Sequence, residues 1–140
     1  MSRIKWNDGL SVGIELIDQQ HKMLLQRIDD ITLAIEKHHG EVKIGTTLQF
    51  LAEYTDFHFS TEEKYMTELD YPGLDYQKTQ HQEFKNTLKN LTDDFLEEGA
   101  THTLAASIDT FLINWFVKHI KAVDIKFADF LNEKGLQITE

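Results

Sequence analysis

Apolar residues recur every three or four positions along most of the chain, which is the spacing of one buried face of an α-helix. In the second quarter of the chain these steps alternate between four and three, as in the packed seam of a helix bundle. The spacing predicts four helices, at about 18–38, 41–69, 72–97 and 101–133. Four amphipathic helices joined by short links predict an all-α, up-down-up-down four-helix bundle.

The expected helix ends follow from residues that stop or cap a helix. The single proline, Pro72, cannot lie inside a helix and suits the first turn of the third one. We expect Asp18 to cap the first helix and Thr101 the fourth, because their side-chain oxygens accept bonds from free backbone N–H groups. Residues 1–17 lack a clean period and are expected to form an irregular N-terminal arm. We therefore expect one domain spanning residues 1–140.

Composition narrows the class of function. The chain has 140 residues, 41% of them hydrophobic, and no cysteine, which excludes disulfides, thiolate metal sites and cysteine nucleophiles. Its formal net charge of -10 repels phosphate backbones and argues against nucleic acid as a partner. No apolar run approaches the ~20 residues of a membrane helix, and the first residues contain no apolar signal segment. We expect a cytoplasmic protein with no membrane partner.

Several polar residues occupy inward positions that the helical pattern reserves for apolar side chains. They are His21, His58, Glu62, Gln77, His81 and His119, and together they involve all four predicted helices. Burying one unpaired polar group costs about 1–3 kcal/mol, and an ionised carboxylate costs more. Since a small domain has a net stability of about 5–15 kcal/mol, these groups need a common compensating partner.

A bound metal ion is such a partner, because imidazole nitrogens and carboxylate oxygens are ligands of iron, zinc and manganese. Residues four apart lie one turn apart on a helix, so His58 and Glu62 project together, as do Gln77 and His81. A lone buried histidine is more often a hydrogen-bonded core residue, and His58 beside Glu62 could be a surface pair. Polar residues on the inner faces of all four helices nevertheless favour a metal site of the kind that bundles commonly hold.

Five elements stand in a distinctive order along the chain. They are Trp6-Asn-Asp-Gly, Ile17-Asp-Gln-Gln-His21-Lys, the H-x-x-x-E element His58-Phe-Ser-Thr-Glu62, Tyr71-Pro72 before the third helix, and the W-x-x-x-H-x-x-x-x-D element from Trp115 to Asp124. Together they resemble the hemerythrin family, specifically its bacterial hemerythrin-like domains, over nearly the whole chain. The resemblance implies a four-helix bundle around two non-haem Fe ions joined by an oxo or hydroxo bridge.

The resemblance also implies how the ligands are divided. His21 and His58 would hold one iron, Gln77, His81 and His119 the other, and Glu62 and Asp124 would bridge the pair. Asp124 rests on the resemblance alone. It lies five residues after His119, which is about 140° around an ideal helix and therefore not the same face.

Position 77 departs from the family pattern, which has H-x-x-x-H where this chain has Gln77-Lys-Thr-Gln-His81. The second iron is therefore expected to bind either the amide oxygen of Gln77 or a water. His38 and His102 are not expected to substitute, because each lies about 25 Å along its helix from the implied ligand there. An amide oxygen is a poorer donor than imidazole, so we expect weaker iron retention or an extra exchangeable position.

The activity implied by the resemblance is reversible O2 binding for storage, transport or sensing. The residues matching the family's apolar O2 pocket are Leu24, Phe59, Trp115, Phe116 and Ile120, which could equally be ordinary core residues. We expect an oxygen-binding protein rather than an enzyme, with an O2-consuming or signalling protein as the implied partner class. Two alternatives stay open: a di-iron enzyme that acts on peroxide or nitric oxide or oxidises iron, and a metal-storing or one-metal structural bundle.

Overall fold

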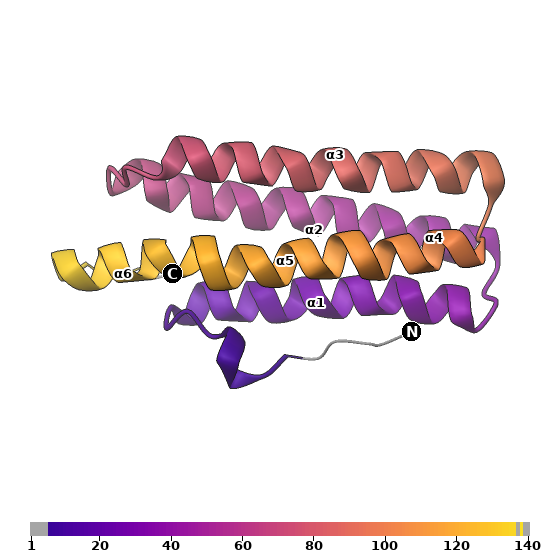
Figure 1. Cartoon of the computed structure of the whole chain (residues 1–140), viewed down its shortest axis with the longest axis horizontal. Coiled ribbons are helices and arrows are strands. Elements are labelled where there is room, and N and C mark those ends of the chain that lie inside the picture. The colour runs from indigo at the N-terminus through magenta and orange to yellow at the C-terminus, as the bar shows by residue number, and fades with distance from the viewer. Residues whose placement is uncertain (1–5, 137, 139–140) are drawn as a thin grey trace.

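Long helical rods run side by side, and each reverses the direction of the one before it (Figure 1). The computed structural model describes residues 6–136 and residue 138, apart from the side chain at position 109. The elements in chain order are η1 (Asp8–Leu10), α1 (Glu15–Glu36), α2 (Glu41–Glu68), α3 (Leu74–Glu98), α4 (His102–Ser107), η2 (Ile108–Ile113), α5 (Asn114–His119), η3 (Ile120–Asp124) and α6 (Ile125–Lys134). The pieces from α4 to α6 form one continuous rod. The described residues include no strand, and the predicted all-α, up-down-up-down bundle is confirmed.

The first rod begins earlier than expected, and Asp18 is not its cap. The helix α1 starts at Glu15, so Asp18 lies about one turn inside it. The Asp18 carboxylate instead accepts hydrogen bonds from the backbone N–H of Val12 (2.9 Å) and from the hydroxyl of Ser11, which ties the arm to the helix. Thr101 caps the fourth rod as predicted, because its hydroxyl accepts a bond from the backbone N–H three residues on (3.0 Å).

The turn between α2 and α3 is made by backbone geometry more than by its proline. Pro72 lies before α3, which begins at Leu74, and not in the first helical turn as expected. The helix α2 ends because Asp70 adopts a left-handed conformation, with φ of 55°. The backbone N–H of Tyr71 then bonds to the carbonyl of Met66 at 2.9 Å, which satisfies the end of the helix.

Apolar side chains from all four rods fill the space between them. Phe59, Phe84 and Phe116 are fully buried, and the ring of Phe84 lies 5.6 Å from that of Phe59 and 6.4 Å from that of Phe116. A smaller cluster of Met66, Phe127 and Leu131 packs where α2 ends and α6 passes. The bundle therefore surrounds any polar group inside it with apolar walls.

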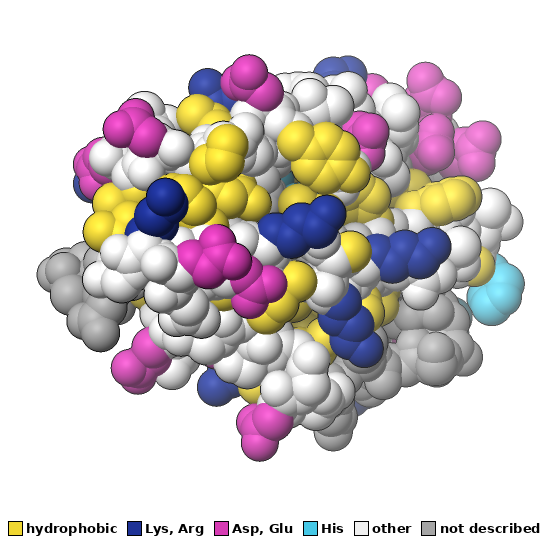
Figure 2. All heavy atoms as spheres, turned by 60° about the vertical axis from the view of Figure 1, so that its left-hand side comes forward, with side chains coloured by type: hydrophobic (Ala, Val, Ile, Leu, Met, Phe, Trp, Pro, Cys, Tyr) yellow, Lys and Arg dark blue, Asp and Glu magenta, His cyan; other side chains and the backbone are white. Residues whose placement is uncertain are grey.

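The outer surface is mixed in character. The face shown in Figure 2 carries both acidic and basic side chains, with apolar ones between them. The three histidines outside the core, which are His38, His39 and His102, are exposed near helix ends. Among the helices of the described chain, none has the length and the hydropathy needed to cross a membrane.

Candidate metal centre

Two clusters of histidine and carboxylate side chains lie inside the bundle and share one residue. One contains His21, His58 and Glu62, and the other contains Glu62, His81, His119 and Asp124. In each cluster the candidate ligand atoms lie within 4.8 Å of one another, and all six side chains are at most 2% exposed. Because Glu62 belongs to both clusters, a carboxylate stands where it could bridge two ions.

The helix α2 places Glu62 at the centre of this arrangement. Its carboxylate Oε1 lies 3.1 Å from Nε2 of His58, one turn earlier on the same helix, and 3.4 Å from Nε2 of His81 on α3. The other oxygen, Oε2, lies 3.8 Å from Nε2 of His21 on α1. One carboxylate thus faces imidazoles from three helices, as the inward positions in the sequence predicted.

A local widening of the fourth rod brings Asp124 into the site. The segment η3 is a π-helix, in which the hydrogen bonds join residues five apart instead of four. Residues five apart therefore share a face there, and Nε2 of His119 lies 3.1 Å from Oδ1 of Asp124. The second oxygen, Oδ2, lies 3.1 Å from Nε2 of His21. The 140° offset calculated for an ideal α-helix does not apply, because the helix is not ideal at this point.

Many of the inward-facing atoms have no hydrogen bond, although they are fully buried. Among the described residues, no hydrogen bond reaches one inward atom of each of seven side chains, although several of these atoms lie within ion-pair distance of one another: Nε2 of His21, His58, His81 and His119, Oε1 of Glu62 and Gln77, and Oδ2 of Asp124. Buried polar atoms are nearly always satisfied in native proteins, so such a concentration marks a functional site. Four imidazole nitrogens facing two carboxylates form a donor set that suits metal ions.

The outer nitrogens of three imidazoles are held by partners on neighbouring helices. Nδ1 of His58 lies 2.8 Å from Oε1 of Gln20, and Nδ1 of His119 lies 3.4 Å from Oε1 of Gln80. Nδ1 of His81 lies 2.7 Å from a carboxylate oxygen of Glu63. An acceptor at Nδ1 places the proton there and leaves Nε2 free to bind metal. None of these three contacts was predicted from the sequence.

The charges of the cluster stabilise one another. Burial lowers the pKa of His21, but the nearby carboxylates of Asp124 and Glu62 outweigh burial and raise the pKa to about 9. Burial raises the pKa of Glu62, but the imidazoles of His58, His21 and His81 outweigh it and hold the pKa well below its usual value. The pKa of His58 is lowered, chiefly by its burial. Both the ionised carboxylate and the protonated His21 are therefore favoured at neutral pH without a metal ion.

The comparisons with known proteins identify the family of this chain. The model of the Hemerythrin HHE cation binding domain matches residues 12–131. The chain belongs to the hemerythrin family. It is 29% identical over 129 residues to a bacteriohemerythrin of Stenotrophomonas maltophilia, with 92% of this chain and 82% of that protein covered.

Two further relatives extend the comparison. The chain is 29% identical over 122 residues to a myohemerythrin of Sipunculus nudus, with 87% of this chain and 88% of that protein covered. A crystal structure of a hemerythrin point mutant superposes with a TM-score of 0.80 at 22% identity, covering 92% of this chain and 97% of that one, and shows the same fold. The resemblance to hemerythrins that the sequence motifs indicated is confirmed.

Gln77, at the position where the hemerythrin pattern has histidine, lies in the site. Its side chain is fully buried, and its amide Nε2 donates a hydrogen bond to Oδ1 of Asp124 at 3.0 Å. Its carbonyl Oε1 is one of the buried atoms without a partner in the described structure. The amide therefore orients one of the two buried carboxylates and keeps an oxygen free to act as a ligand.

The residues expected to line an O2 pocket lie around the clusters. Leu24, Phe59, Phe116 and Ile120 are buried in the core, and Trp115 is half-buried. The Phe116 ring lies edge-on to the His21 ring at 5.2 Å. The Phe59 ring stacks on that of His81 at 3.9 Å, and the Trp115 ring stacks on that of His119 at 4.6 Å. Aromatic faces thus shield the imidazoles from water.

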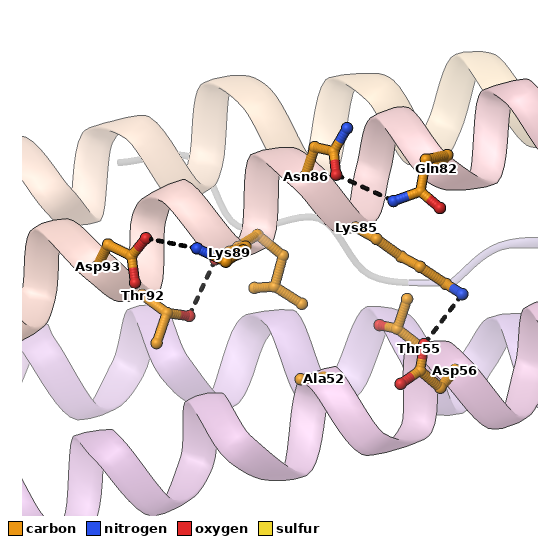
Figure 3. A pocket seen from close by; sticks show the side chains of 10 residues that line it. Ala52, Thr55, Asp56, Gln82, Lys85, Asn86, Lys89, Thr92 and Asp93 are labelled. Atoms are coloured by element: carbon orange, nitrogen blue, oxygen red, sulfur yellow. Dashed lines mark hydrogen bonds and ion pairs between the residues drawn. The ribbon is translucent and has the colours of Figure 1, made fainter.

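A surface groove of about 370 Å³ between α2 and α3 is a separate feature (Figure 3). Its charged side chains are already paired, Lys85 with Asp56 at 3.1 Å and Lys89 with Asp93 at 3.0 Å. Its lining also includes Ala52, Thr55, Leu88 and Thr92. The buried clusters, and not this groove, carry the concentration of chemically unusual groups.

Proposed function

We propose that this chain binds O2 reversibly at a centre of two iron ions joined by an oxo or hydroxo bridge. Proteins of the hemerythrin family bind O2 at a di-iron centre. The observation that carries the proposal for this chain is the pair of adjoining clusters that share Glu62, with their nitrogen and oxygen atoms buried and without hydrogen bonds within the described structure. Such a donor set fits two ions that prefer imidazole and carboxylate.

The division of the ligands is the one that the hemerythrin resemblance implies, and the two clusters support it. His21 and His58 would hold the first ion, Gln77, His81 and His119 would hold the second, and Glu62 and Asp124 would be shared between them. Support for Gln77 as a ligand is its buried carbonyl oxygen, which has no partner among the described residues. The amide N–H bond to Asp124 fixes the side chain so that the amide cannot turn its nitrogen toward the ion without losing that bond.

When bound, the two ferrous ions supply the two electrons that O2 takes up on binding. The protein side chains determine what else reaches them. Phe116 and Phe59 are fully buried against the imidazoles, so they exclude water from the space beside the ions. Water exclusion strengthens electrostatic interactions inside the site and suppresses side reactions of the bound gas. The apolar walls thus favour release of O2 unchanged over oxidation of the ions.

The experiment is stopped-flow mixing of the reduced, iron-loaded protein with O2, after elemental analysis for two irons per chain. A carrier gives a long-lived charge-transfer band that disappears when O2 is removed and returns when O2 is added again. A preparation with two irons that gives no such band contradicts O2 carriage.

A second function, a di-iron enzyme that reduces peroxide or nitric oxide or oxidises iron, is favoured by one observation. Gln77 offers the second ion a neutral amide oxygen, which is a weaker donor than imidazole and is more easily displaced. Both ions could then accept external ligands. In the same stopped-flow experiment, rapid decay to the diferric form together with turnover of added peroxide supports the enzyme.

A further inference from the structure

The three imidazoles with partners at Nδ1 do not have equivalent partners. His58 and His119 meet the neutral amide oxygens of Gln20 and Gln80. His81 meets the carboxylate of Glu63 at 2.7 Å, the shortest of the three contacts. Glu63 is 25% exposed, so part of its carboxylate contacts solvent while one oxygen faces the ring. Within the described residues, His81 is therefore the one imidazole of the centre whose Nδ1 contacts a carboxylate.

A carboxylate at Nδ1 changes the ring as a ligand. Hydrogen bonds to an ionised acceptor are shorter and stronger than those to a neutral amide. A carboxylate that accepts the Nδ1 proton pushes electron density toward Nε2, which makes that nitrogen a better donor to a metal, besides fixing the orientation of the ring. The stacking of Phe59 on the same ring at 3.9 Å, with an interplanar angle of 5°, holds it in that orientation.

The strengthened imidazole belongs to the cluster that has the weakened ligand. Gln77 lies one helical turn before His81 on α3. Gln77 contacts the carboxylate of Asp124, and His81 contacts that of Glu62. The second cluster therefore has the amide of Gln77 in place of an imidazole, and it is also the cluster in which the carboxylate of Glu63 contacts the outer nitrogen of His81. The first cluster has neither feature, since its one Nδ1 partner is the amide of Gln20.

We propose that Glu63 is a positioning residue that strengthens His81 as a ligand and so retains the second metal ion despite Gln77. The inference rests on the proposed two-ion centre and concerns how the second ion is held. Glu63 itself does not touch the ions. Glu63 affects the binding of the second ion through the imidazole of His81. Its carboxylate orients the ring, and its negative charge makes Nε2 a stronger donor.

The test is a titration of the metal-free full chain with Co²⁺, followed by calorimetry and by the visible absorption of the bound ion. Glu63→Gln keeps an oxygen that accepts the Nδ1 proton but removes the charge. We expect this variant to bind the second Co²⁺ about 10- to 100-fold more weakly, with the first ion unaffected. Its second-ion absorption should also shift, because the donor strength of His81 changes. Glu68→Gln is the matched control, since it removes one carboxylate from an exposed position of the same helix.

A rescue variant separates ligand strength from folding. The double variant Glu63→Gln with Gln77→His supplies a stronger third ligand to the second ion, so it should recover the affinity lost in Glu63→Gln. Glu63→Ala also removes the hydrogen-bond acceptor, so it should bind the second Co²⁺ more weakly than Glu63→Gln does. In the NMR spectrum of its Co²⁺ form, the Nδ1 proton of His81 should exchange with solvent faster than in the wild type.

The outcomes distinguish this inference from the proposed function. Two ions bound with equal affinity by the wild type and by Glu63→Gln overturn the role of Glu63 while the two-ion centre stands. Equal weakening of both ions in Glu63→Gln, or no recovery in the double variant, also overturns it, because the effect would then be a general loss of structure. A wild-type chain that binds fewer than two ions overturns both proposals.

Discussion

Removing the metal ions should destabilise the bundle strongly. The centre buries imidazoles, carboxylates and an amide between apolar walls, and many of their atoms have no hydrogen bond to any described residue. In the proposed protein the ions satisfy these atoms. A chelator removes that compensation without changing a single contact in the apolar core, so the change in unfolding free energy reports the centre itself.

The size of the effect follows from the number of affected atoms. Seven buried atoms that face the centre, one from each of the seven proposed ligands, have no hydrogen-bond partner among the described residues. An unsatisfied buried polar group costs about 1–3 kcal/mol, and the lower end applies because the imidazoles and carboxylates partly neutralise one another. The loss is therefore about 7 kcal/mol. At about 3 °C per kcal/mol for a domain of this size, the melting temperature should fall by about 20 °C.

The measurement is differential scanning calorimetry of the loaded protein, of the same preparation after dialysis against a chelator, and of that sample after Zn²⁺ is added back. Zn²⁺ suits the nitrogen and oxygen donors and has no redox chemistry, so its recovery of stability separates ligation from oxidation. Ca²⁺ is the control ion, since it prefers oxygen ligands and should restore little.

The reasoning is wrong if the metal-free protein melts at the temperature of the loaded protein. It is also wrong if Ca²⁺ restores the melting temperature as fully as Zn²⁺ does, because the stabilisation would then not depend on imidazole. A metal-free structure with the histidines turned to solvent would show how the chain avoids the cost.

Four further predictions follow from the same geometry. Gln77→His should tighten iron at the second site and slow autoxidation, as measured by iron competition and by the decay of the oxygenated spectrum; unchanged values for both would show that position 77 does not control the site. The pKa of His21 in the metal-free fold is about 9, above its ordinary value of 6.5, so its protonation adds up to about 3 kcal/mol to the free energy of unfolding. This stabilisation is complete below pH 6.5 and is lost as pH rises through 9. Urea midpoints of the metal-free protein between pH 6 and 10 test this, and a midpoint that rises over that range contradicts it. Glu62→Gln should leave fewer than two irons per chain by elemental analysis, because the carboxylate facing three imidazoles is removed; two irons would refute bridging. Phe116→Ala should cost about 3–5 kcal/mol of unfolding free energy and speed autoxidation by admitting water beside His21, so an unchanged autoxidation rate would exclude a shielding role.

The helix ends show where local sequence was sufficient and where it was not. Thr101 caps the fourth rod as predicted, because capping needs only a hydroxyl beside free backbone N–H groups. Asp18 was expected to do the same, but its carboxylate bonds to the N-terminal arm, which packs back against the helix. No local rule predicts that contact, since it depends on the path of the arm.

The candidate site divides in a similar way. His58 and Glu62 could be paired from their spacing, and polar residues at inward positions of all four helices pointed to a shared site. Asp124 followed from the hemerythrin resemblance but not from ideal helix geometry, because the π-helix that turns it inward departs from the 3.6-residue period of an α-helix. Glu63 was overlooked because it lies beside the apolar stripe, next to a proposed ligand on one helix, and contacts an imidazole on another.

The sequence by itself determined that four amphipathic helices would pack together and that their inner faces would carry imidazoles and carboxylates. Both follow from periodicity, which is a local property of the chain. Periodicity could not give the contacts that the tertiary structure shows: Glu62 belongs to two clusters, Asp124 faces His119, and an acid contacts His81 while Gln77 contacts Asp124. These features depend on helix registry and on the π-helical segment η3, which are set by packing between elements far apart in the chain.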